Sequence, residues 1–214
     1  MLRLLKRHFY INHIYILNSA ELYDPPTGIW TITGCTNEPR VYHTASVLKN
    51  GKVLVSGSMT NTAELYDPLT GTWTYTGQLH GMRWWHTASV LADGKVLVAG
   101  GINAGDYLNS VELYDPATEI WTMTGTMNNS RISHVASLLN NGKVLVAGGE
   151  PDEGVLNTAE LYDPSTRVWT TTGSMNRDRA WFTASVLEDG KVLVAGGLNN
   201  DYFSNMETAE LYDP

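Results

Sequence analysis

The feature that most constrains this chain is a run of nine residues that recurs along it. The run reads DGKVLVAGG at 93–101, NGKVLVAGG at 141–149 and DGKVLVAGG at 189–197, with a shorter copy, NGKVLVSG, at 50–57. Its Asn-Gly or Asp-Gly pair is the strongest short hairpin signal, because a two-residue type I′ turn needs positive φ at both central positions. The unbroken aliphatic stretch that follows predicts a strand covered on both faces.

A second motif divides the chain into repeated units. The sequence AELYDP or VELYDP starts at residues 20, 63, 111, 159 and 209, so its copies lie 43 to 50 residues apart. A Trp follows the Asp of the first four copies six residues later, and an Arg follows each Trp after ten more residues. We therefore divide the chain into a degenerate partial first blade at 1–17 and a repeat domain at 18–214. The units of this domain lie at about 18–39, 40–82, 83–130, 131–178 and 179–214.

Each full unit predicts four short strands and no helix. They are an HTASVL-like strand with small residues, the KVLVAGG strand, the AELYDP strand, and a Thr- and Trp-rich strand such as GTWTYTG. Four-stranded meanders at this spacing predict an all-β protein, a β-propeller with the small first strand innermost.

The order of these motifs resembles the kelch repeat. It combines R-x-x-H, a hairpin to an apolar strand that ends in Gly-Gly, E-x-Y-D-P, and a Trp six residues after the Asp. The resemblance covers about residues 18–214 and implies a propeller of four-stranded antiparallel blades. It implies no reaction, because most kelch propellers are binding platforms and only some are enzymes.

The two ends of the chain depart from a complete array. We expect a poorly matched strand around Ile14 to Leu17, and the first unit has no HTASVL or Gly-Gly copy. The last unit ends before its Trp strand, so the readable strands predict about four and a half blades. Closing a ring from both ends would duplicate strands. Two interpretations are therefore possible: the chain is a small irregular five-bladed ring, or it is a piece of a longer array. We favour the second interpretation.

Charge, hydropathy and cysteine content exclude several classes of partner. The net charge of −8 and the pI of about 5.1 disfavour nucleic acid, whose phosphates need a basic face. No apolar run approaches the ~18 residues of a membrane span. The single cysteine, Cys35, allows no intrachain disulfide. It favours a cytoplasmic location over a secreted one without excluding secretion.

The connection between the second and third strands varies in length, whereas the other connections are constant. Variable loops on a rigid scaffold are where such folds bind partners, and extra aromatic residues gather near these loops beside the repeated arginines. The candidate binding residues are Arg40, Tyr42, Arg83, Trp84, Trp85, Tyr107, Arg131, Arg179, Trp181, Phe182, Tyr202 and Phe203. The alternative is that these aromatic residues pack between blades and shield the arginines.

Three histidines, His43, His86 and His134, occupy equivalent positions, and Phe182 replaces them in the last unit. We expect each histidine to form a hydrogen bond within its own blade rather than to bind a metal, and we expect no cofactor. A copper site like that of galactose oxidase needs a His and Tyr set that departs from the repeat, and Cys35 has no such neighbours in the sequence. The repeated Glu and Asp of ELYDP are expected to cap strands and turns rather than to catalyse glycoside hydrolysis.

These observations favour a non-enzymatic scaffold that binds a protein or peptide. The predicted contact face carries the loops between strands two and three and the loops between strand four and the next strand one. A carbohydrate-binding, galactose-oxidase-like or glycoside-active propeller is the main alternative, because aromatic side chains also suit sugar rings. The other alternative is a partial repeat array without independent function.

Overall fold

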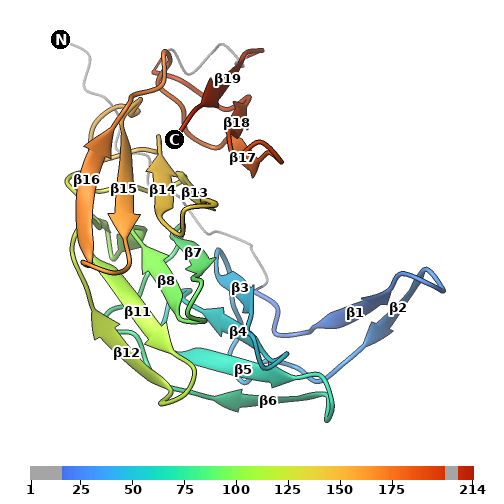
Figure 1. Ribbon diagram of the computed structural model, residues 1–214. Coiled ribbons are helices and arrows are strands. Elements are labelled where there is room, and N and C mark those ends of the chain that lie inside the picture. Colours follow the sequence, from blue (N-terminus) through green and yellow to red (C-terminus); the bar gives the residue numbers. More distant parts are fainter. Residues whose placement is uncertain (1–15, 201–206) are drawn as a thin grey trace.

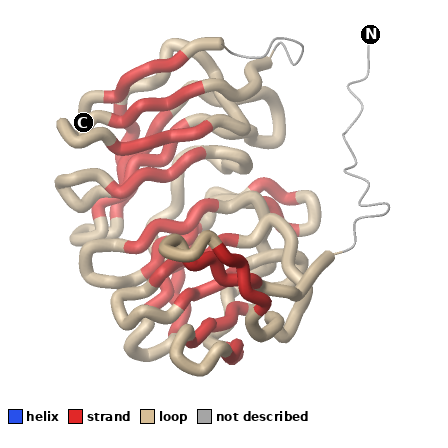
Figure 2. Tube along the Cα trace, turned by 90° about the vertical axis from the view of Figure 1, so that its right-hand side faces the viewer, coloured by secondary structure: helices blue, strands red, loops and turns tan. Residues whose placement is uncertain are grey.

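The computed structural model describes residues 16–200 and 207–214, and these residues fold into strands and loops only. Figure 1 shows small antiparallel sheets that follow one another along an arc. Figure 2, turned by 90°, shows that each sheet is a short stack of strands joined by loops. The described part of the chain contains no helix that could cross a bilayer.

Three sheets are complete four-stranded blades, each ordered as a meander. The second blade contains β3 (Thr44–Val47), β4 (Val53–Ser56), β5 (Ala63–Asp67) and β6 (Thr72–Tyr75). The third contains β7 (Thr87–Val90), β8 (Val96–Ala99), β11 (Val111–Asp115) and β12 (Ile120–Met123). The fourth contains β13 (Val135–Leu138), β14 (Val144–Ala147), β15 (Ala159–Asp163) and β16 (Val168–Thr172). The four strands predicted for each unit are therefore confirmed in these three blades.

The first and last blades are smaller. The first consists of β1 (Glu21–Asp24) and β2 (Ile29–Ile32), and the last of β17 (Thr183–Val186), β18 (Val192–Ala195) and β19 (Ala209–Tyr212). The strand expected around residues 14–17 is not formed at Ile16 and Leu17, and residues 14 and 15 lie outside the described part. A hairpin that the sequence did not predict, β9 (Ile102–Asn103) with β10 (Asp106–Tyr107), lies in the long loop of the third blade.

The first strand of each blade lies on the inner side of the arc, as the small residues of the sequence predict. Strand β7 contacts both β3 and β13, and β13 contacts β17. Figure 1 shows these strands on the concave side, with β6, β12 and β16 on the outside. The residues that precede these inner strands therefore all lie on the same face of the arc.

The second strands form the core, because each is covered by a blade on either side. In β8 all four residues, Val96, Leu97, Val98 and Ala99, are buried. Val96 and Val98 pack with Leu54 of the preceding blade, whereas Leu97 and Ala99 pack with Val144 and Val146 of the next. The doubly covered strand predicted from GKVLVAGG is thus confirmed, and each buried aliphatic side chain contributes about 1.5–3 kcal/mol.

The Tyr and Trp of each unit join neighbouring blades. Tyr114 and Trp121 are cross-strand partners with ring centroids 5.0 Å apart. The Tyr114 hydroxyl pairs with Thr76 Oγ1 at 2.7 Å, and Trp121 Nε1 donates to the carbonyl of Gly77 at 2.8 Å, both in the preceding blade. The same two contacts recur one blade later from Tyr162 and Trp169. The fixed spacing from Asp to Trp therefore serves the stacking of blades.

Candidate functional site

The strand order gives each blade two unlike ends. We call the end with the loops between strands two and three, and between strand four and the next strand one, the loop face. The opposite end, with the hairpin turns between strands one and two and between strands three and four, is the turn face. The loop face carries ten of the twelve residues proposed for binding from the sequence, and the other two, Tyr202 and Phe203, lie outside the described residues.

The four proposed arginines are buried behind the loop face. Arg40, Arg83, Arg131 and Arg179 are at most 6% exposed. Each one forms an ion pair with the Glu of its own ELYDP motif, at N–O distances of 2.6 to 2.9 Å. Arg131 shows the full pattern, because its guanidinium also donates to the carbonyls of Gly148 and Thr158. These arginines therefore fasten the loops to their blades and present no free charge to a partner.

The paired glutamates also hold the incoming loop. Glu64 accepts hydrogen bonds from the backbone and side-chain amides of Asn37, both at 2.7 Å, and from Arg40. Burial alone would raise the pKa of Glu64, but the hydrogen bonds from Asn37 and Arg40 outweigh it and lower the pKa. Glu160 accepts the same pair of bonds from Asn128. The Glu of ELYDP is thus a capping group, as the sequence indicated.

A Gly at the end of the second strand lets the next blade approach closely. A side chain at Gly100, which has φ of 64°, would place Cβ 2.6 Å from the carbonyl oxygen of Arg131 and 2.9 Å from the His134 ring. The next glycine, Gly101, donates its amide to that same Arg131 carbonyl at 2.8 Å. The Gly-Gly pair therefore marks a close contact between neighbouring blades.

The histidines link neighbouring blades, which corrects the expectation of bonds within one blade. His86 Nε2 pairs with Thr44 Oγ1, and His134 Nε2 pairs with Thr87 Oγ1, each at 2.9 Å across a blade boundary. Phe182 takes the equivalent position in the last blade, where it is 8% exposed and belongs to the hydrophobic cluster against which Val135 packs. Among the described residues no group of His, Cys, Asp and Glu is arranged to hold a metal ion.

Four proposed aromatic residues gather at the start of the inner strands. We call Tyr42, Trp84, Trp85 and Trp181 the aromatic rim. Trp85 lies at its centre, with ring centroids 4.7 Å from Tyr42, 6.5 Å from Trp84 and 5.8 Å from Trp181. Tyr42 is 39% exposed and Trp181 is 45% exposed. The rim thus joins side chains from three blades and remains open to solvent.

The backbone beneath the rim is strained and ordered. Tyr42, Trp85, Ser133 and Trp181 occupy the same position in successive blades, and their φ angles are 52°, 55°, 54° and 58°. Side chains in this left-handed region cost roughly 1–2 kcal/mol each relative to Gly. Backbone hydrogen bonds join them in series, from Trp85 to Tyr42, from Ser133 to Trp85 and from Trp181 to Ser133. The small Ser133 lies between the two Trp positions, and this leaves the Trp85 and Trp181 rings in contact.

The remaining candidates lie in the variable loops. Tyr107 belongs to the β9–β10 hairpin and is partly exposed. Tyr202 and Phe203 lie outside the described residues. The loop of the fourth blade contributes Glu150, whose Oε1 accepts a hydrogen bond from Trp181 Nε1 at 2.6 Å. No repeat signal in the sequence pointed to the contact of Glu150 with Trp181.

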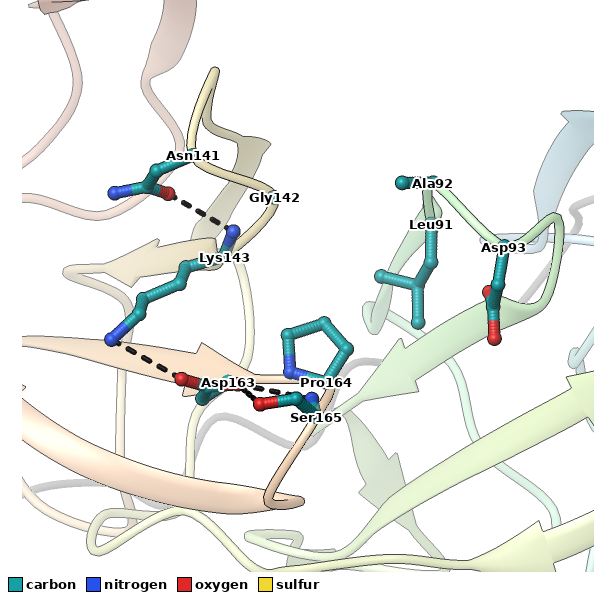
Figure 3. A pocket seen from close by; sticks show the side chains of 9 residues that line it. All are labelled: Leu91, Ala92, Asp93, Asn141, Gly142, Lys143, Asp163, Pro164 and Ser165. Atoms are coloured by element: carbon teal, nitrogen blue, oxygen red, sulfur yellow. Dashed lines mark hydrogen bonds and ion pairs between the residues drawn. The ribbon is translucent and has the colours of Figure 1, made fainter.

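A cavity of about 430 Å³ lies on the turn face, between the third and fourth blades. Figure 3 shows Lys143 extended toward Asp163 on one side of the cavity, with Asp93 on the other side. Lys143 Nζ lies 3.3 Å from Asp163, and the Lys143 amide donates to Asn141. Between the second and third blades Lys49 spans the equivalent space and donates to the carbonyl of Ala92. The cavity exists because Ala92 itself takes the Lys49 position in the third blade, so it reflects a shorter side chain rather than a built site.

Comparison with known proteins agrees with this architecture. Residues 86–128 and 131–176 each match the family model of the kelch motif. The matches begin at the first strand of the third and fourth blades and run through their fourth strands. A search of curated proteins found no match. Two repeat units of the chain thus match the kelch motif, and its four-stranded antiparallel sheets form an all-β structure consistent with the blades of a kelch-type β-propeller.

Proposed function

We propose that the chain is a non-enzymatic scaffold that binds a protein or peptide on its loop face. The observation that carries this proposal is the aromatic rim, which is half-exposed and lies on strained backbone. Trp and Tyr supply much of the binding energy in protein interfaces, because they bury a large area at a low cost in side-chain entropy. Strained backbone persists only where the surrounding structure holds it in place, and it clusters at functional sites.

Rigid support around the rim favours this proposal over a role in packing alone. Residues of the two kinds of loop pair with each other, as Trp84 does with Ile102, Ile132 with Glu150 and Ala180 with Leu198. The buried Arg–Glu pairs hold the same loops from below. A preorganised surface loses less entropy on binding, so its aromatic contacts contribute more to affinity.

Carbohydrate binding is the second candidate, since half-exposed Trp rings also stack on sugars. A glycan array separates the two candidates. Selective glycan capture that depends on Trp181 would favour the carbohydrate reading, whereas no capture favours a peptide.

The direct experiment selects peptides from a random display library against the protein and measures their affinity for variants. The combined change Trp84→Ala and Trp85→Ala is expected to lower affinity at least tenfold. The control is Trp30→Ala, which removes an exposed Trp, 63% exposed on β2, outside the loop face. Circular dichroism must show that the variants keep the wild-type fold. Equal affinity for the rim variant and the wild type would contradict the proposed face.

A further inference from the structure

We infer that the aromatic rim receives a cationic side chain, Arg or Lys, from a basic peptide segment. This inference rests on the proposed function and adds the chemistry of the partner. Three observations lead to it, namely the geometry of the rings, a carboxylate bonded to one of them, and the distribution of charge between the two faces.

The rings of the rim present their faces in different directions. The plane of Trp85 is inclined by 47° to Tyr42, 74° to Trp84 and 73° to Trp181. Tyr42 and Trp181 are 39% and 45% exposed, so part of each of these two rings remains accessible to a ligand. The faces of aromatic rings carry negative potential, and Trp attracts a cation more strongly than Tyr or Phe does.

Glu150 strengthens this attraction at Trp181. Its Oε1 accepts the indole N–H at 2.6 Å, a short hydrogen bond to a charged acceptor. Such a bond moves electron density into the indole ring, which makes its face more negative. The carboxylate also places a negative charge at the edge of the ring, next to the ring face on which the cation of a bound Arg or Lys would lie.

Charge is divided unequally between the two faces. All five lysines of the described residues lie in the turns between strands one and two, on the turn face, and Arg167 lies in a turn there too. On the loop face the four repeat arginines are neutralised by buried glutamates, so Arg177 is the one exposed Arg or Lys in the described part of that face. The described acids there that are outside the Arg pairs are Glu38, Asp106, Glu150, Asp152, Glu153, Asp178 and Glu207.

This excess of negative charge selects among peptide partners. An acidic segment would be repelled, and a neutral one would gain nothing from the carboxylates around the rim. A basic segment gains both the long-range attraction of the face and the short-range contact with the rings. Arg fits best, since its planar guanidinium stacks on aromatic faces and is weakly hydrated.

The experiment uses short fluorescein-labelled Gly/Ser peptides that differ only at their guest positions, which hold Arg, Lys, Gln or Glu. Fluorescence anisotropy should show that the Arg and Lys peptides bind more tightly than the Gln and Glu peptides. Raising the salt concentration from about 0.05 to 0.5 M should weaken the Arg peptide several-fold, because screening shortens the range of the attraction.

Variants assign the binding to the rim. Trp181→Ser copies the residue that Ser133 supplies at the same position and φ in the neighbouring blade, so the fold should tolerate it. The Trp181→Ser variant is expected to bind the Arg peptide roughly 3- to 30-fold more weakly, which is the range of a cation–π contact. Glu150→Gln keeps a hydrogen-bond acceptor but removes the charge. It should lower the affinity for the Arg peptide and leave the affinity for the Gln peptide unchanged. Trp30→Ala is the control and should change neither.

The outcomes separate this inference from the proposed function. Gln or Glu peptides that bind as tightly as the Arg peptide, or an Arg peptide insensitive to Trp181→Ser, would overturn the cationic ligand. Peptides selected from a random library would then decide whether the loop face binds peptides at all. If their binding depends on Trp181, the face stands and only its preference for cations is wrong. If they bind Trp181→Ser and the Trp84/Trp85 variant as they bind the wild type, the proposed function fails as well.

Discussion

At the scale of single residues, two boundaries between blades hold a polar pair of side chains, and the next boundary holds an apolar pair at the same repeat positions. His86 with Thr44 and His134 with Thr87 are hydrogen-bonded, whereas Phe182 and Val135, at the same places in the repeat, lie in one hydrophobic cluster. Burial, and then the charge of Arg83 or Arg131, lowers the pKa of each of these two histidines to about 3. Both histidines are therefore neutral in the folded protein at physiological pH.

The neutral histidines should make stability depend on pH. In the unfolded chain they take up protons below pH 6.5, whereas in the folded protein they do so only near pH 3. The stability is therefore complete above pH 6.5 and falls as the pH is lowered toward 3. Between pH 7 and pH 5 each histidine should lower the free energy of unfolding by about 2 kcal/mol. Replacing His134 by Phe together with Thr87 by Val should remove about half of the loss due to the two histidines, measured by urea denaturation at both pH values.

The reciprocal exchange provides the control for this prediction. Phe182→His with Val135→Thr builds a third polar pair at an existing boundary, so it should increase the loss between pH 7 and pH 5. An unchanged pH dependence in both double variants would show that other groups govern the acid response.

The buried Arg–Glu pairs support a second prediction about single residues. Arg131→Ala leaves Glu160 buried without its charged partner, and breaking such a pair typically costs about 3–5 kcal/mol. Arg177→Ala is the matched change, because Arg177 is an exposed arginine on the same face and should alter stability by less than about 0.5 kcal/mol. Chemical denaturation of the two variants checks the contrast. Equal stability losses would mean that the ion pair adds nothing beyond its surroundings.

At the scale of strands, the same repeat position contributes unequally to stability in different blades. Trp121 on β12 is 4% exposed and bonded to the preceding blade, whereas Trp30 on β2 is 63% exposed. Trp121→Ala should cost about 3–5 kcal/mol, the range for large core truncations. Trp30→Ala should cost less than about 1 kcal/mol. Thermal or urea unfolding of the pair measures the difference, and similar losses would refute the view that these Trp residues act between blades.

The strands show which structural features can be predicted from the sequence. The aliphatic second strands and the Tyr–Trp strand pairs follow from local chemistry, and each recurs in register, so they were predictable. The hairpins form where Asn-Gly and Asp-Gly predict them, but only the Gly of each pair has positive φ, so the expectation of a two-residue type I′ turn was wrong. The ion pair between Arg131 and Glu160 joins residues 29 apart, and no local pattern indicates that the arginine is buried there. The aromatic rim combines residues from three blades, so only the three-dimensional stacking brings Trp181 to Trp85. The β9–β10 hairpin lacks the Asn-Gly or Asp-Gly signal, since its turn is formed by Ala104 and Gly105.

At the scale of the whole molecule, stability should decrease from the centre of the arc toward its ends. Strands β8 and β14 are buried throughout, whereas every residue of β1 and β2 is exposed and β19 is at best partly buried. In repeat proteins each unit is stabilised mainly by its direct neighbours, so a central blade has two stabilising interfaces and a terminal blade has one. The terminal sheets should consequently open locally more often than the central ones.

Hydrogen–deuterium exchange measures this gradient directly. Peptides that cover β8, β11, β14 and β15 should exchange most slowly, because their amides open only when the central blades separate. Peptides from β1 and β2 should exchange fastest, and those from β18 should be intermediate, since Val192 and Val194 are buried on one face only. If all strands exchanged at one common rate, the blades would unfold as a single cooperative unit. That result would contradict the gradient and indicate that the Tyr, Trp and His contacts between blades outweigh the differences in burial.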